Sequence, residues 1–298
     1  MKKKKAAGIE TLKARYGTYL SLFWLIGMLL FFVVPIVMSI VYSFSDIKID
    51  ANKVTVLMTG IKNYTHLIYT DPKYMNNLVA GISSIFSKVP FILVISMILG
   101  IFLNNKFKGR IFFRSLFFLP VIISSGVVLD LFLEAAQGDA TSVAGADTLS
   151  FGMMNFSELL EGLNLPGNIQ QYLSTALDNL FMLIWQSGIQ IILIIAGLQT
   201  IPDLLYEVAQ VEGATKWEQF WFITLPMMIR TILIVLIYTI VEAVTIKTNS
   251  VIKQGYNFFY NLEYGLGSAA LWLYFVLVAL IIAAIFFVFN KVFLKKWG

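Results

Sequence analysis

Six long apolar runs constrain this chain more than any other feature of its sequence. A helix needs roughly 20 predominantly apolar residues to cross about 30 Å of hydrocarbon, because each residue adds about 1.5 Å. Each run meets that length. The sequence therefore predicts an all-α integral membrane protein with six transmembrane helices, at about 18–43, 78–103, 111–134, 177–199, 227–250 and 266–292.

Composition excludes most classes of soluble enzyme. The chain is 58% hydrophobic and 13% charged, whereas soluble domains carry about 25% charged residues. It has no cysteine and a single histidine, His66, so it offers no disulfide framework, no cysteine nucleophile and no set of ligands for a structural zinc site. No Walker A sequence, H-E-x-x-H or G-x-S-x-G motif occurs, and a membrane-embedded enzyme is the class least expected.

The distribution of basic residues predicts the orientation of the spans. Residues 1–17 form a basic tail, the connection after the second run is also basic, and the C-terminal end carries three lysines from Lys291 onward. Residues 135–176 contain four acidic residues and no basic residue. By the positive-inside rule, both termini and the connection at about 200–226 are cytoplasmic, and 135–176 is external. Four lysines in the first external connection argue weakly against this topology: Lys48, Lys53, Lys62 and Lys73.

The connection between the fourth and fifth runs reads EVAQVEGATKWEQFWFITLP from Glu207 to Pro226. Apolar residues at helical spacing from Ile201 to Val211, after a start at Thr200 and Pro202, predict a short amphipathic helix that ends near Glu212. Gly213 would supply the positive φ that closes this helix.

A second helix is predicted directly after the glycine. Thr215 and Glu218 have the spacing of a capping box, and Pro226 suits the first turn of the following membrane helix. Three aromatic residues, Trp217, Phe220 and Trp221, would share one face. Spacing alone leaves open an amphipathic loop that simply rests on lipid headgroups.

The same segment resembles the EAA loop of ABC importer permeases. Glu207, Ala209, Gly213 and the run Ile223–Pro226 have the family's spacing, with Val208 in place of the usual first alanine and Glu212 in place of a residue that is commonly Asp. Ala196-Gly197-Leu198-Gln199 and the stretch FKGRIFFRSLFFLP also look like the carbohydrate-type permeases, of the maltose and glycerol-phosphate kind. The Gly-Gly-Pro often found after the fifth helix in that family is absent.

The resemblance implies the type I ABC importer permease fold, with residues 18–298 as the permease domain, in a bacterial cell membrane. It also implies a second permease subunit, a cytoplasmic ATPase dimer that docks the loop, and an extracytoplasmic solute-binding protein that delivers a sugar. ATP and Mg would reside on the ATPase, and this chain would need no cofactor or metal. The residues expected to couple to the ATPase are Glu207, Ala209, Glu212, Gly213, Ala214, Trp217, Phe220, Leu225 and Pro226.

Polar residues within the spans predict a solute path. An ionisable group near the bilayer centre costs at least about 2.5 to 3.5 kcal/mol, so each invites a functional explanation. Amide and carboxylate groups beside an aromatic ring suit a sugar. The candidates are Ser84, Lys88, Trp185, Gln186, Gln190, Tyr238, Glu242 and Asn249.

Other interpretations of these residues stay open. Lys88 and Glu242 could form a buried ion pair that locks two helices together, and Trp185 could serve helix packing. Asp130 and Glu134, one turn apart, are read as solvated or gate-lining rather than catalytic. An ion- or proton-coupled secondary transporter or channel would explain the six spans and the internal charges, but not the spacing of the loop.

Overall fold

The computed structural model describes residues 9–50, 53–105, 107–124, 160, 166–246 and 249–294. The chain divides into two compact units. Unit 1 combines Met1–Leu78 with Val251–Val276, and unit 2 combines Val79–Ser250 with Leu277–Gly298. Two long helices, α4 (Pro72–Asn104) and α14 (Tyr264–Phe289), contribute residues to both units.

The regular secondary structure in the described residues of unit 1 is helical apart from one β-hairpin. Its remaining elements are α1 (Ile9–Met28), the π-helical turn η1 (Leu29–Val33), α2 (Val34–Ser43), β1 (Ser45–Asp50), β2 (Lys53–Met58), α3 (Lys62–Thr65), the π-helical turn η2 (His66–Thr70) and α13 (Ser250–Tyr260).

The hairpin is a feature that the sequence analysis did not predict. β1 and β2 pair antiparallel, from Ser45 opposite Met58 to Asp50 opposite Lys53. The β-branched residues, Ile47 and Ile49 in alternation in β1 and a consecutive run from Val54 to Val56 in β2, favour strands. The hairpin is held to α3 by Asn63, whose Nδ2 donates to the carbonyl oxygens of Ser43 at 3.1 Å and Ser45 at 2.9 Å.

Buried polar contacts join the start of α4 to α13 and α14. The hydroxyl of the fully buried Tyr74 donates to the carbonyl oxygen of Ala270 at 2.7 Å. Gln254 on α13 donates to Asp71 at 3.0 Å and accepts from Asn77 at 2.6 Å. Each buried polar group of this network has a partner, which fixes the three helices relative to one another.

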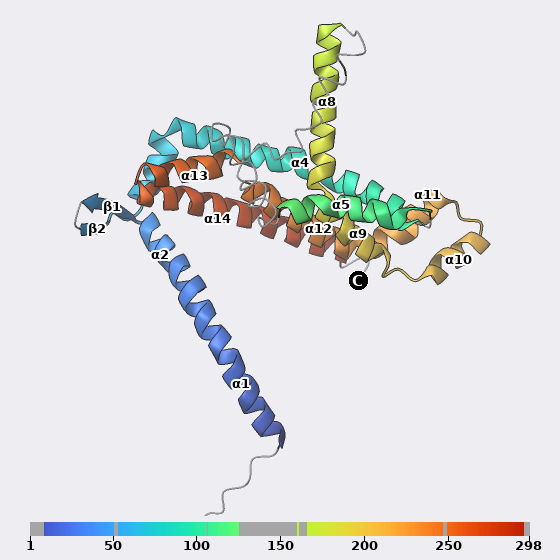
Figure 1. The fold of residues 1–298 in the computed structure, drawn as a ribbon, viewed down its shortest axis with the longest axis horizontal. Helices are drawn as coiled ribbons and strands as arrows, with labels where there is room; N and C mark the ends of the chain where they lie inside the picture. The colour runs from blue at the N-terminus through green and yellow to red at the C-terminus, as the bar shows by residue number, and fades with distance from the viewer. Residues whose placement is uncertain are drawn as a thin grey trace, which may run out of the picture. The chain divides into compact units, whose positions relative to one another are not determined.

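Unit 2 carries the segments of functional interest. Beyond its parts of α4 and α14 it contains α5 (Arg110–Ser124), α8 (Gly167–Gln186), α9 (Gly188–Leu198), α10 (Asp203–Val211), α11 (Lys216–Gln219), the π-helical turn η4 (Phe220–Thr224), α12 (Leu225–Thr245) and the π-helical turn η5 (Asn290–Leu294). α9 packs against both α5 and α12, and Figure 1 shows α10 and α11 projecting past the ends of α9 and α12.

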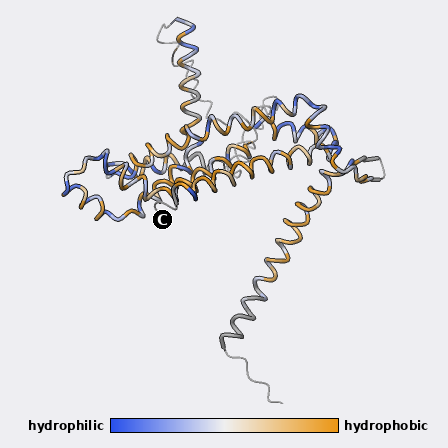
Figure 2. Tube along the Cα trace, turned by 180° about the vertical axis from the view of Figure 1, so that it is seen from behind, coloured by the Kyte–Doolittle hydropathy of each residue, from blue (hydrophilic) through white to orange (hydrophobic). Residues whose placement is uncertain are grey.

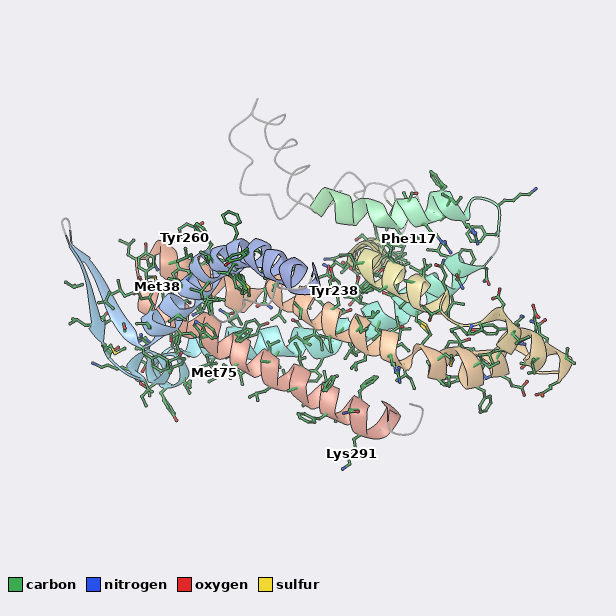
Figure 3. The ribbon with its side chains drawn as sticks, turned by 90° about the horizontal axis from the view of Figure 1, so that it is seen from below. Met38, Met75, Phe117, Tyr238, Tyr260 and Lys291 are labelled. Carbon is green, nitrogen blue, oxygen red and sulfur yellow. The ribbon has the colours of Figure 1, made fainter. Side chains whose placement is uncertain are left out.

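The core of unit 2 surrounds α9. One cluster joins α4, α9 and α12 through Met97, Ile194, Leu198, Ile201, Met228 and Val235. Gly197 permits the close approach of α12, because a Cβ there would lie 2.6 Å from the Oγ1 of Thr231. A second cluster, around Ile191 and Ile195, includes Phe117, and Figure 3 shows Phe117 where α5 lies beside α9.

Four predicted spans have counterparts among the described residues. The segments long and apolar enough to cross a membrane are Ser21–Ser43, Pro72–Asn104, Tyr264–Val292 and Lys216–Tyr260, the last of which includes two residues, 247 and 248, that are not described. Figure 2 shows the apolar residues along α12 and α14 and the hydrophilic ones around the turn between α10 and α11. The third predicted span is described only as far as Ser124, so the total of six stays a prediction.

The fourth predicted span, a single helix over 177–199, is wrong in its boundaries. The structure divides this region at Ser187 into α8, which starts ten residues earlier at Gly167, and α9. The Ser187 hydroxyl donates to the carbonyl oxygen of Ile184 at 2.7 Å. A hydroxyl that hydrogen-bonds the preceding turn, followed by a glycine, interrupts a helix. α9 and α10 form a further candidate span that bends by 66°.

Candidate functional site

The first half of the predicted loop is a helix closed by glycine. α10 ends at Val211, and Gly213 follows with a φ of +82°. The N–H of Ala214 donates to the carbonyl oxygen of Ala209 at 2.8 Å, and the N–H of Gly213 to that of Gln210 at 3.1 Å. These two bonds make a Schellman motif, which requires a left-handed residue at the position of Gly213. The predicted helix and its glycine stop are confirmed.

The second half begins with the predicted capping box. The Glu218 N–H donates to the Thr215 hydroxyl oxygen at 3.3 Å, and the Thr215 N–H donates to the Glu218 carboxylate at 2.7 Å. The predicted aromatic face is also present, because Trp217, Phe220 and Trp221 have ring centroids 5.3 to 6.2 Å apart. Pro226 lies in the first turn of α12, as expected.

Three polar residues that the sequence analysis missed fix the base of the loop. The buried Gln219 donates to the carbonyl oxygen of Ala214 at 3.1 Å. The hydroxyls of Tyr206 and Thr224 lie 2.9 Å apart and join α10 to η4. The one sequence feature that pointed to any of them was the position of Thr224 within Ile223–Pro226, the run shared with the EAA loop. These contacts make residues 200–226, called here the coupling loop, one connected piece.

The tip of the coupling loop leaves apolar residues uncovered within this chain. Of the predicted apolar stripe, only Ile201 joins the core. The relative exposure of Leu204, Val208 and Val211 is 65%, 49% and 89%, and Glu207 is exposed beside them. An apolar stripe with an adjacent carboxylate, on a rigid projection, is suited to contact a partner protein.

The capping box makes the start of α11 sensitive to pH. The N–H and hydroxyl of Thr215 donate to the Glu218 carboxylate and lower the pKa of Glu218 below its ordinary value. This stabilisation is therefore complete above the unfolded-state pKa of about 4.3 and is lost as pH falls through the lower folded value.

We expect amide-exchange protection of α11, corrected for intrinsic rates, to fall as the pH is lowered below about 4. Glu218→Gln is the matched control, because glutamine can complete a capping box without titrating. If protection falls equally in the parent protein and in Glu218→Gln, titration of the Glu218 carboxylate is not the cause of the loss.

A polar cavity of about 150 Å³ lies elsewhere in unit 2, lined in part by α4 and α12, which belong to candidate membrane spans. Five of the eight residues predicted for the solute path line it: Ser84, Lys88, Gln186, Glu242 and Asn249. They come from α4, the end of α8, α12 and the residue preceding α13. Helices distant in sequence thus bring an ammonium, a carboxylate, two amides and a hydroxyl to one space, a set of groups that can hydrogen-bond a polyhydroxylated solute.

The carboxylate of Glu242 is held by an amide. Gln190 Nε2 donates to Glu242 Oε2 at 2.6 Å, and Gln190 is fully buried. The Oε1 atom of Gln190 has no hydrogen-bond partner among the described residues. The ion pair considered between Lys88 and Glu242 is not formed within the described part of the chain; Lys88 is exposed toward the cavity instead.

Tyr238 and Trp185 were also predicted for the solute path, but the structure does not place either side chain at this cavity. Tyr238, labelled in Figure 3, is half-buried on α12 and does not line the cavity. The side chain of Trp185 lies outside the described residues, and so do Asp130 and Glu134.

The sequence of this chain is similar to those of known transporter permeases. The chain is 27% identical over 284 residues to the probable ABC transporter permease protein YesP of Bacillus subtilis (strain 168), covering 88% of this chain and 86% of YesP. It is 26% identical over 244 residues to the multiple sugar-binding transport system permease protein MsmF of Streptococcus mutans, covering 74% of this chain and 78% of MsmF. The curated relatives of this chain are thus carbohydrate ABC transporter permeases. No family model matches it.

A solved structure confirms the fold of this permease. A chain of the bacterial alginate ABC transporter, in complex with an alginate pentasaccharide-bound periplasmic protein, matches with a TM-score of 0.62 at 16% identity. The match covers 93% of this permease and 94% of that chain. The permease is therefore a multi-pass membrane protein with the fold of an ABC importer permease, as the sequence analysis predicted.

Proposed function

We propose that this permease forms one half of the translocation path of an ATP-driven importer of a sugar or oligosaccharide, and that the coupling loop transmits motion from a partner ATPase. The observation that carries the proposal is the coupling loop: a glycine-closed helix and a capped helix, joined at their base and apolar at their tip. A second permease would form the other half of the path, and the ATPase dimer would hold ATP and Mg.

The loop is suited to transmit force because it is tied directly to membrane helices. Ile201 before α10 packs in the same cluster as Ile194 and Leu198 of α9 and Met228 of α12. A displacement of the tip would therefore move α9 and α12 together as a rigid body. We place the loop and both termini on the cytoplasmic side, in line with the positive-inside rule.

The solute class is supported by the chemistry of the cavity. Its amide, carboxylate, ammonium and hydroxyl groups can each bond a sugar hydroxyl. The names of MsmF and of the alginate transporter refer to carbohydrates, and the alginate structure includes a periplasmic protein loaded with an oligosaccharide. We propose that an extracytoplasmic binding protein likewise delivers the sugar to this permease.

Reconstitution in proteoliposomes with the second permease, the ATPase and a loaded binding protein tests the function. We expect sugar uptake only when ATP is supplied to the ATPase, and Glu207→Ala to reduce solute-stimulated ATP hydrolysis strongly while membrane insertion is retained. Glu263→Ala is the matched control, because Glu263 is an exposed acid of unit 1. Uptake by this chain alone, driven by an ion gradient without ATP, would instead establish the secondary-transporter alternative.

A further inference from the structure

A groove of about 430 Å³ lies between α5 and α9 in unit 2, apart from the coupling loop and the polar cavity. Its walls are mostly apolar, formed by Phe117 of α5 and by Ile191, Ile192 and Ile195 of α9. One end carries Arg114 and Gln199, and no acidic residue lines it. A cationic end and a hydrocarbon wall thus occur in one groove of a membrane protein.

Arg114 is held in place by the end of α4. Its Nε and Nη2 donate to the carbonyl oxygen of Leu103 at 3.2 and 3.0 Å. Arg114 forms no ion pair among the described residues, so its charge is not neutralised there. A guanidinium that is oriented by one carbonyl and keeps free N–H groups is prepared to bind a phosphate.

We propose that this groove binds one anionic phospholipid, with the phosphate on Arg114 and an acyl chain against Phe117, Ile191 and Ile192. Basic pockets between transmembrane helices bind the headgroups of anionic lipids in this manner. Lys108 and Arg110 precede Arg114 in the same segment and add to the local positive potential. This lipid site is independent of the proposed transport function.

A phospholipid fits the groove better than a helix of a partner subunit. A helix of a partner subunit would have to place an acidic side chain against Arg114, whereas every anionic phospholipid carries its phosphate next to its acyl chains. The neighbouring residues of α5 are also apolar and uncovered within this chain, with relative exposures of 75% for Ile111 and 66% for Phe112. Such a surface is compatible with contact to acyl chains.

Native mass spectrometry of the assembled transporter tests the proposal, after exchange into micelles containing phosphatidylglycerol or phosphatidylcholine. We expect one additional phosphatidylglycerol per copy of this chain, and at least about fivefold less retention in Arg114→Gln. Ile192→Trp should reduce retention equally, because it fills the groove without removing charge or the contact with Leu103. Arg110→Gln is the matched control, since Arg110 does not line the groove, and should retain most of the lipid.

Unchanged phosphatidylglycerol retention in both Arg114→Gln and Ile192→Trp would overturn the proposal. So would a photocrosslinker at Ala196 that captures the second permease rather than lipid, because a protein would then occupy the groove. The measurement needs neither ATP nor sugar. A transporter that fails the transport test can therefore still pass this one, and the two proposals fail separately.

Discussion

Replacing Gly213 by valine is expected to lower solute-stimulated ATP hydrolysis by the assembled transporter at least about tenfold, without reducing the amount of inserted protein. The backbone at Gly213 has a φ of +82°. A residue with a Cβ pays about 1 to 2 kcal/mol in the left-handed region, and a β-branched one is a genuine outlier there. Since about 1.4 kcal/mol is a factor of ten, the population of the docking conformation relative to other loop conformations would fall about tenfold.

The cause of this effect would be backbone strain rather than a clash, because a Cβ at position 213 would meet no atom within 4 Å. Asparagine adopts the left-handed region far more readily than valine. We therefore expect Gly213→Asn to retain most of the stimulated hydrolysis. Full coupling in Gly213→Val, or an equal loss in Gly213→Asn, would show that the left-handed turn does not set the loop's conformation.

Replacing Gln190 by leucine is expected to destabilise the permease by about 2 kcal/mol, the scale of a hydrogen bond to a charged group. The substitution removes the donor 2.6 Å from the Glu242 carboxylate and leaves that carboxylate without its amide partner. Reversible unfolding in mixed detergent micelles measures the loss. Gln186→Leu is the matched control, because Gln186 lines the same cavity at its surface and is half-buried.

The double variant Gln190→Leu/Glu242→Leu separates a structural role of this pair from a role in transport. Replacing both partners by apolar groups is often nearly neutral for folding, so stability should return close to that of the parent. Sugar transport should stay impaired, because the carboxylate that lines the cavity is gone. If the double variant stays as unstable as Gln190→Leu, the hydrogen bond is not the source of the loss. If it transports normally, Glu242 does not contribute to the solute path.

The coupling loop could be predicted nearly residue by residue because its signals are local. A glycine after an apolar helical pattern and a threonine three residues before a glutamate each act through bonds to neighbouring backbone groups. The structure has both the Schellman motif at Gly213 and the capping box at Thr215. The long apolar runs were equally informative, since span length depends on composition alone.

The features that the sequence did not predict depend on contacts between distant segments. Lys88 and Glu242 have opposite charges, yet Glu242 is hydrogen-bonded to Gln190 of α9 instead. This contact forms because α9 packs against α12, which the sequence does not reveal. The break at Ser187 interrupts an apolar pattern that continues on both sides. The hairpin β1–β2 had a readable alternation, but its strands are short beside the long helical patterns around them.

The most direct test of the central claim is a labelling experiment at the tip of the coupling loop. The chain contains no cysteine, so Val211→Cys would introduce a single thiol at a side chain with 89% relative exposure. A membrane-impermeant maleimide should label it in inside-out vesicles but not in intact cells, and bound ATPase should block the labelling. Labelling from the outer face of intact cells, or labelling that the ATPase leaves unchanged, would contradict a cytoplasmic loop that couples this permease to its ATPase.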